Sequence, residues 1–258
     1  MSDGGLYTAM SGGMATSRQL DVTSNNLANI DTTSYKKDKT IFKEQLAKIA
    51  FDDINEVQAE NADMPPRVLP LDKHNVLVDE TFTDFSQGKL EKTDNSLDLA
   101  INGRGFFKVK TPNGILYTRD GSFHRSKDGI LVTSDGYAVL DDNENEIELD
   151  GKTLVINENG SVYQGKNKIS KLALVDFKNL DSLKKIGKNL YVQTDKNAVE
   201  IESNGIILQG FLETSNVNPV EEMVNLISLQ RQFELNGKAI ESFSETDKKA
   251  TSDLGRIG

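Results

Sequence analysis

The chain has no cysteine and no tryptophan among its 258 residues, and only two histidines. Without cysteine there is no disulfide framework and no thiolate metal site. The histidines, His74 and His124, lie far apart, and neither has a second histidine at the spacing of a metal-ligand pair. We therefore expect a surface or turn position for each, and we predict no metal and no cofactor.

Apolar residues are also scarce, at 36%, and aromatic residues make up 7%. No run approaches the ~20 apolar residues of a membrane-spanning helix. Residues 1–6 lack the basic and apolar regions of a cleaved secretory signal. Forty acidic against thirty basic residues give a net charge of −10, which argues against a nucleic-acid partner. The composition predicts a modest core, with some region that orders only on assembly.

Residues 6–27 carry a heptad spacing typical of a thin helix seam. Gly12 and Gly13 fall inside it, and such a helix is marginal in water, so it needs a partner. The asparagines and threonines that follow favour turns, and we expect extended chain near Asp31. The predicted seam consists of Leu6, Met10, Gly13, Ser17, Leu20, Ser24 and Leu27.

The C-terminal residues 216–258 show the same helical spacing. Asn218 before Pro219, followed by two glutamates, predicts a cap and an acidic first turn. The sequence alone leaves two roles equally open for the terminal helices, covering one face of a β body or pairing in an assembly. The predicted seam consists of Met223, Leu226, Gln230, Phe233, Gly237, Ile240, Ser244, Asp247, Thr251 and Leu254.

Between the helices the signals change to strands. Short apolar runs separated by glycine-containing turns, at roughly 8–12-residue spacing, indicate a meander that forms a sandwich, barrel or wrapped sheet. Ile41, Phe42, Leu46 and Ile49 permit one more helix, whereas the prolines of residues 65–70 force a non-helical connection. We predict an α+β chain with a mainly-β centre. Its parts are 1–35 (N-terminal helix and junction), 36–80 (extended linker), 81–215 (central β domain) and 216–258 (C-terminal helix).

Three short motifs suggest ligand sites, and each fails at a position that its chemistry requires. Residues 151–153 (Gly-Lys-Thr) resemble the end of a phosphate-binding loop, but Glu146 stands where the earlier glycine is needed. Residues 141–152 begin like a calcium loop, but Glu146 and Lys152 replace its glycine and closing glutamate. Residues 103–105 (Gly-Arg-Gly) lack the third glycine of a dinucleotide site. We predict turns at all three and no catalytic residue.

Three blocks, in order, resemble the signatures of bacterial flagellar basal-body rod and hook proteins. The first is Asn25-Asn26-Leu27-Ala28-Asn29 with Thr32, Tyr35 and Lys36. The second is residues 97–107 with 117–123, and the third is residues 212–217 with 222–234. That family usually has glycine before the aromatic residue of the first block. Ser34 in its place argues against a left-handed backbone there.

The resemblance implies a structural, non-enzymatic subunit of the flagellar rod, the drive shaft that transmits motor torque to hook and filament. Residues 1–35 and 216–258 would pair as an inner coiled coil on assembly. The implied partners are copies of the chain, other rod and hook subunits, and the flagellar type III export apparatus. The implied location is the basal-body rod that spans the periplasm, reached by export without a cleaved signal peptide. Chain length excludes a typical hook protein, and residues 5–10 and 230–234 favour the proximal over the distal rod.

The resemblance also implies which residues contact neighbouring subunits. The N-terminal motif comprises Asn25, Asn26, Leu27, Ala28, Asn29, Thr32, Tyr35 and Lys36. The C-terminal motif comprises Ser215, Asn216, Val217, Glu222, Met223, Leu226, Ile227, Gln230, Arg231 and Phe233. The helix seam contributes Leu6, Met10, Leu20, Ile240 and Leu254.

Two other classes of protein provide alternatives. A monomeric β-rich binding or adhesin module would have both termini protected from proteolysis, whereas the rod interpretation predicts rapid trimming to about residues 70–215. A peptidoglycan hydrolase would need paired carboxylates or a metal in a deep cleft. The sequence shows no such convergence of residues.

Overall fold

The computed structural model describes residues 3–150, except 47–73, and residues 154–254, except 196–197. They form two compact units. The first takes its described residues from Met1–Asn25, Lys39–Phe82 and Val220–Gly258, and the second consists of Asn26–Asp38 and Thr83–Pro219. We call the first the helical unit and the part of the second within 83–219 the β body. Residues 26–38, the junction segment, therefore group with the β body although helical-unit residues flank them on both sides.

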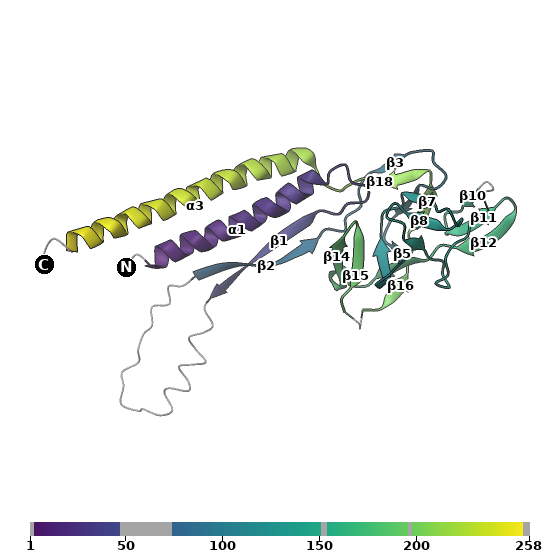
Figure 1. The fold of residues 1–258 in the computed structure, drawn as a ribbon, viewed down its shortest axis with the longest axis horizontal. Coiled ribbons are helices and arrows are strands. Elements are labelled where there is room, and N and C mark those ends of the chain that lie inside the picture. Colours follow the sequence, from purple (N-terminus) through teal and green to yellow (C-terminus); the bar gives the residue numbers. More distant parts are fainter. Residues whose placement is uncertain (1–2, 47–73, 151–153, 196–197, 255–258) are drawn as a thin grey trace, which may run out of the picture. The chain divides into compact units, whose positions relative to one another are not determined.

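The helical unit pairs α1 (Asp3–Ala28) with α3 (Pro219–Leu254), which run side by side in opposite directions (Figure 1). Small residues of α1 make the contact. A Cβ atom built on Gly5 would lie 2.9 Å from the ring of Phe243, so a larger residue there would collide with it. Further along, Asn236 donates a side-chain hydrogen bond to the hydroxyl of Thr16 at 3.3 Å.

The seam between these helices matches the predicted one only in part. On α1 the contacts use Gly5, Gly12, Gly13 and Thr16, and of these four Gly13 belongs to the predicted seam. The predicted positions Met10, Ser17 and Ser24 are exposed. Small residues let the two helices approach closely, as predicted, but most of them lie on a neighbouring face of α1, since one residue turns a helix by roughly 100°.

The match on α3 is also partial. Asn236 and Phe243 face α1, next to the predicted Gly237 and Ser244, and the predicted Leu226 and Ile240 are half-buried. The predicted seam residues Met223 and Phe233 are exposed. Large apolar side chains therefore remain outside the helix pair.

Residues 38–46 are a strand and not a helix. β1 (Asp38–Leu46) pairs with β2 (His74–Thr83) as a two-stranded sheet of the helical unit. Ile41, Phe42 and Leu46, which permitted a helix, lie in β1, and Ile49 lies outside the described residues. β-branched and aromatic residues recur in both strands, and pairing with a partner strand outweighs the ambiguous local pattern.

The β body consists of short strands and one 3₁₀ turn. Its largest sheet has the order β14-β15-β6-β5-β9-β8-β7, and β13 joins it through β5 and carries β16. Separate small sheets are β10-β11-β12, β17-β4 and β18-β3. The bounds are β3 (Leu90–Lys92), β4 (Leu99–Asn102), β5 (Phe106–Thr111), β6 (Gly114–Thr118), β7 (Phe123–Arg125), β8 (Leu131–Thr133), β9 (Ala138–Val139), β10 (Leu154–Ile156), β11 (Ser161–Gln164), β12 (Asn167–Lys171), β13 (Leu174–Phe177), η1 (Leu180–Ser182), β14 (Leu183–Gly187), β15 (Leu190–Gln193), β16 (Glu200–Glu202), β17 (Ile206–Gln209) and β18 (Phe211–Glu213).

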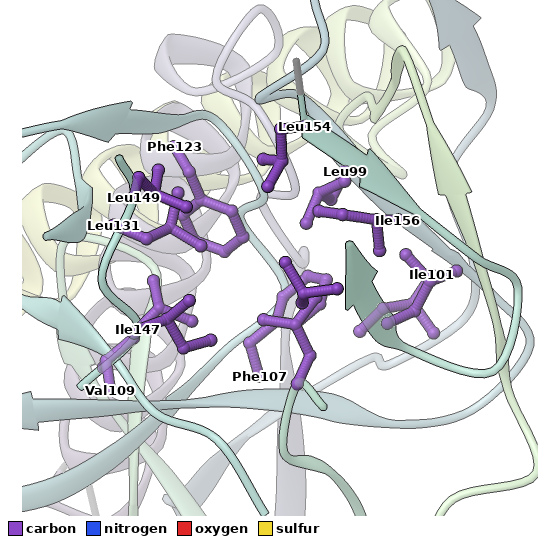
Figure 2. Packing of buried hydrophobic residues seen from close by; sticks show 14 of the residues in the cluster. Leu99, Ile101, Phe107, Val109, Phe123, Leu131, Ile147, Leu149, Leu154 and Ile156 are labelled. Carbon is purple, nitrogen blue, oxygen red and sulfur yellow. The ribbon is translucent and has the colours of Figure 1, made fainter. Parts of the chain in front are cut away.

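The apolar core lies inside the β body. Figure 2 shows side chains of β4, β5, β7, β8 and β10 pointing toward one another, and Phe107 and Phe123 pack edge to face at 5.2 Å between ring centroids. A second, aromatic cluster contains Phe106, Tyr117 and Tyr191. Each fully buried apolar side chain contributes about 1.5–3 kcal/mol. The scarce apolar residues are thus concentrated in one unit.

The predicted α+β fold, with a mainly-β centre between two terminal helices, is confirmed. Two of the three short motifs adopt turns as predicted. Gly103 and Gly105 have positive φ in the connection from β4 to β5. In the acidic run, Asp141 is buried and accepts hydrogen bonds from the N–H groups of Asn143 and Asn145. Residues 151–153 lie outside the described residues.

Candidate functional site

Two connector segments lead out of the β body, and they lie against each other. The N-terminal connector, residues 29–37, follows α1, and the C-terminal connector, residues 213–218, follows β18. The N–H of Ser34 donates to the carbonyl of Glu213 at 2.8 Å, and the N–H of Asn216 donates to the carbonyl of Tyr35 at 3.3 Å. Residues about 180 positions apart thus share backbone hydrogen bonds, a relation that local sequence does not reveal.

A buried ion cluster joins the connectors. The ammonium of Lys36 lies 2.6 Å from one carboxylate oxygen of Glu213, and Nε of Arg119 lies 2.9 Å from the other. The side chains of Lys36 and Glu213 are both 0% exposed. Burial lowers the pKa of Lys36 and outweighs the opposing attraction of Glu213. The cluster holds two cations and one anion, so the carboxylate is shared.

Arg119 also binds the backbone of the β4–β5 connection. Its guanidinium donates to the carbonyls of Gly103 and Gly105, each at 2.9 Å, and to that of Ile101 at 3.3 Å. This planar group has five donors and remains charged, so it can satisfy a carboxylate and several carbonyls together. The cluster is therefore anchored in the body's core strands.

Asn216 of the C-terminal connector hydrogen-bonds both to the N-terminal connector and to the segment that follows β2. Its Oδ1 accepts from the N–H of Lys37 at 2.8 Å. Its Nδ2 donates to the carbonyl of Asp84 at 2.8 Å and to that of Ser86 at 3.1 Å. An amide supplies both donors and acceptors, so this single side chain links the connectors to the segment after β2.

Lys185 of β14 covers the other side of the N-terminal connector. Its ammonium lies 3.6 Å from the centroid of the Tyr35 ring, a cation–π distance. It also donates to the carbonyl of Lys36 at 2.8 Å and to the carboxylate of Asp38 at 3.3 Å. Burial is the main cause of the lowered pKa of Lys185, against the attraction of Asp38.

The expectation for Ser34 was wrong. Its φ is 55°, so the backbone is left-handed although the residue is not glycine. The hydroxyl donates to the carbonyl of Arg119 at 2.8 Å, and the residue is fully buried. Such a backbone costs a non-glycine residue about 1–2 kcal/mol, which the serine offsets with a hydrogen bond that glycine lacks.

Comparison with known proteins decides the family. Family models match three regions: "Flagella basal body rod protein" over residues 6–36, "Flagellar hook protein FlgE/F/G D1 domain" over 100–164, and "Flagellar basal body rod FlgEFG protein C-terminal" over 208–253. The flagellar basal-body rod protein FlgF of Caulobacter vibrioides is 36% identical over 99% of both chains. The chain belongs to the flagellar basal-body rod protein family. The rod protein FlgG of Buchnera aphidicola subsp. Schizaphis graminum is 34% identical over 95% of this chain and 97% of its own. That of Bacillus subtilis is 32% identical over 93% and 95%.

This family membership confirms the predicted class. The chain is a structural subunit of the flagellar basal-body rod, a part that assembles with other flagellar axial proteins. The three matched regions each contribute one member of the ion cluster: Lys36 ends the first, Arg119 lies in the second, and Glu213 lies in the third. The cluster thus joins the three regions that the family models match.

The structure gives part of the predicted N-terminal contact motif an intramolecular role. Asn26, Tyr35 and Lys36 are buried in the second unit and hydrogen-bond within the chain. Asn25 and Ala28 are exposed, and Leu27, Asn29 and Thr32 are half-buried.

The C-terminal motif is more accessible. Val217 and Glu222 are buried, and Ser215, Asn216 and Leu226 are half-buried. Met223, Ile227, Gln230, Arg231 and Phe233 are exposed. Of the seam residues, Leu6, Leu20 and Ile240 are half-buried and Met10 is exposed, while the side chain of Leu254 lies outside the described part of the chain.

Sequence reasoning did not assign a role to Arg119, Glu213 or Lys185. Arg119 and Glu213 stand in the blocks that carried the resemblance, and that position was the available signal. His74 begins β2, and His124 is exposed in β7. Among the described side chains, no group of three or more His, Asp or Glu is placed to hold a metal. No helix within the described ranges is long and apolar enough to cross a bilayer.

Proposed function

We propose that this rod subunit polymerises through its helical unit, with α1 and α3 forming an inner coiled coil with the helices of neighbouring copies. One observation supports this most directly. Val220, Met223, Val224 and Ile227 of α3 are 68, 47, 61 and 50% exposed. Their spacing of i, i+3, i+4 and i+7 places them on one helix face.

We call residues 220, 223, 224 and 227 the apolar face of α3. An exposed apolar face of this kind is typical of a helix that packs against a partner helix. Met10 and Met14 of α1 are exposed in the same unit and add to the apolar surface. Burying a Val, Ile or Met side chain is worth about 1.5–3 kcal/mol. A neighbouring subunit that covers the face therefore supplies a strong drive for assembly.

The β body would act as the outer, load-bearing part of the shaft. The ion cluster ties both connectors to it, so torque carried by the helices would pass into a rigid domain. Catalysis plays no part in this function. The cleft of about 570 Å³ on the β body is lined by several carboxylates, of which Glu144 pairs with Lys108 and Glu202 with Lys171.

The proposal also covers how the subunit is exported and in which part of the rod it assembles. The chain would leave the cytoplasm through the flagellar type III apparatus, which suits a protein without thiols that could cross-link during passage. Residues 5–10 and Phe233 favour the proximal rod. The order of genes around this one would test that assignment, because rod genes of each class have characteristic neighbours.

The assembly face is tested by introducing charge. Val224→Glu combined with Ile227→Glu should leave the thermal unfolding of the monomer unchanged, because both side chains are exposed. The same variant should abolish swimming and leave basal bodies without complete rods in electron micrographs. Val199→Glu, at an exposed valine of the β body, is the matched control. Normal rods and swimming in the double variant would refute assembly through this face.

A deletion provides a second test. Residues 1–25 belong to the helical unit, whereas 26–35 complete the second unit, so the deletion should end at residue 25. The shortened protein should keep the cooperative unfolding of the β body and fail to build rods. A strain that swims with this deletion would rule out the paired-helix shaft.

A further inference from the structure

The junction segment is held to the β body like a bound peptide. It is separated in sequence from residue 83 by 39–82, which belong to the helical unit. Non-covalent contacts hold it to the body. They include the hydrogen bond that the Ser34 hydroxyl donates, the one that the Thr33 carbonyl accepts from Asn189 at 2.7 Å, and the one that the Lys37 carbonyl accepts from the N–H of Asp84 at 2.8 Å. The site that receives it is thus built from several separate loops and strands.

The charges make the two connectors depend on each other. Lys36 comes from the N-terminal connector, Glu213 from the start of the C-terminal one, and Arg119 from the core. Removing Lys36 leaves one ion pair, whereas removing Glu213 leaves two buried cations facing each other. Losing one partner of a buried pair is strongly unfavourable because the remaining charge stays desolvated.

Hydrogen bonds reinforce this dependence at both ends of the cluster. Besides Glu213, the Lys36 ammonium binds the carbonyl of Ser86 at 2.7 Å, and the same Glu213 oxygen accepts from the N–H of Gly88 at 2.8 Å. If the N-terminal connector leaves, Glu213 and Ser86 each lose a partner in a buried place. If the C-terminal connector leaves, Lys36 and Arg119 lose theirs.

We propose that the Lys36–Glu213–Arg119 cluster is a latch. It makes residues 26–38 part of the cooperative folding unit of the β body, so that both connectors open together or not at all. The boundary between independently opening units then lies at residues 25/26 and 38/39, and not at the start of the β strands. Trimming of the isolated chain would stop near residue 26 rather than near residue 70.

Hydrogen exchange of the full-length monomer, read by mass spectrometry, tests the latch without any assembly. Peptides covering 29–37 and 213–218 should exchange at the same rate as each other and as the core peptide 106–111. The peptide covering 5–20 of α1 should exchange faster. Exchange of residues 29–37 at the rate of α1 would overturn the proposal.

Substitutions test the role of the charges. Lys36→Met keeps the length of the side chain and removes the ammonium. It should speed exchange of both connectors on the order of a hundredfold, as expected for a broken buried pair. Lys188→Met, which breaks the exposed pair with Asp135, is the control and should change neither. Acceleration of 29–37 alone, with 213–218 unchanged, would show that the connectors open separately.

The double variant Lys36→Met with Glu213→Gln covers the case in which the single variant does not fold. It removes the uncompensated carboxylate together with the ammonium. The latch predicts that both connectors then exchange faster than residues 106–111, each at its own rate, because no buried charge pair couples them any longer. Connectors that still exchange at the rate of residues 106–111 would overturn it. Because every readout comes from the monomer, failure of the latch and failure of the proposed assembly are distinguishable.

Discussion

The hydroxyl of Tyr35 donates a hydrogen bond to Oδ1 of Asn26 at 3.1 Å. The same oxygen accepts from the N–H of Asp38 at 2.9 Å, and Nδ2 of Asn26 donates to the carbonyl of Asp38 at 2.9 Å. The amide of Asn26 therefore links the two ends of the junction segment, the last turn of α1 and the first residue of β1. No other side chain of this size provides a donor and an acceptor in that arrangement.

Replacing this amide should be costly. Asn26→Ala removes three hydrogen bonds, including those to the part-buried N–H and carbonyl of Asp38, so we expect a loss of about 2–4 kcal/mol in the free energy of unfolding. Urea unfolding of the purified monomer measures it. Ser24→Ala, at a nearby exposed position of the same helix, should change stability by less than ~0.5 kcal/mol. Equal effects of the two substitutions would contradict the closure of the segment by Asn26.

Two substitutions at Ser34 separate the free-energy cost of its left-handed backbone from the contribution of its hydroxyl hydrogen bond. Ser34→Ala and Ser34→Gly both lose the hydroxyl, but only glycine relieves the conformational strain. We therefore expect the glycine variant to be more stable than the alanine variant by about 1 kcal/mol. The glycine variant should lie close to the wild type, because relief of strain offsets the lost hydrogen bond. Thermal unfolding of all three proteins checks this order, and an alanine variant as stable as glycine would disprove it.

The hydroxyl of Tyr191 is buried and has no hydrogen-bond partner among the described residues, and burial raises the pKa of this hydroxyl. Tyr191→Phe should therefore leave stability unchanged or raise it by up to about 1 kcal/mol, since no bond is lost. Tyr117→Phe is the matched comparison, because the Tyr117 hydroxyl donates to Glu200 and lies in the same aromatic cluster. It should lower stability by about 1–2 kcal/mol. The opposite order in urea unfolding would show that Tyr191 has a partner.

The pKa of Asp120 is raised, mainly by burial, although hydrogen bonds from Ser122 act in the opposite direction. A raised pKa means that the folded state binds the proton more tightly than the unfolded state. The resulting stability is fully present below the ordinary value of 3.8 and is lost as the pH rises through the folded-state pKa. At neutral pH the ionised, desolvated carboxylate therefore destabilises the fold.

Asp120→Asn should remove this dependence while keeping an acceptor oxygen for Ser122. The variant should gain stability relative to the wild type as the pH rises from about 3.5 to about 7, by about 1.4 kcal/mol for each unit of pKa shift. Urea unfolding at several pH values measures the difference. A difference that stays constant across this range would show that Asp120 titrates at its ordinary pKa.

The order of elements could be predicted because its signals are local. Asn218, Pro219 and the two following glutamates identify the start of α3 within the few residues that form its first turn. The turns between strands likewise depend on glycine and asparagine at particular positions. Such signals need no knowledge of distant contacts.

The helix seam could not be predicted as well. The predicted heptad, which contains both apolar and small residues and includes Met10, has almost the same spacing as Gly5, Gly12 and Thr16. Which of these two faces packs depends on how closely α3 approaches, and α3 lies some 200 residues further along the chain. The apolar residues of α3 that do not contact α1, such as Met223 and Ile227, supported the assembly proposal only once the structure showed that they are exposed.

The chain's sequence by itself determined the terminal helices, the β centre and the family, because periodicity, caps and signature blocks are properties of neighbouring residues. Only the tertiary structure decided that residues 26–38 belong with the β body. The reason is the desolvated charge of Lys36, which is stable there only beside Glu213, 177 residues away. Burial sets that requirement, and burial exists only once the whole chain has folded.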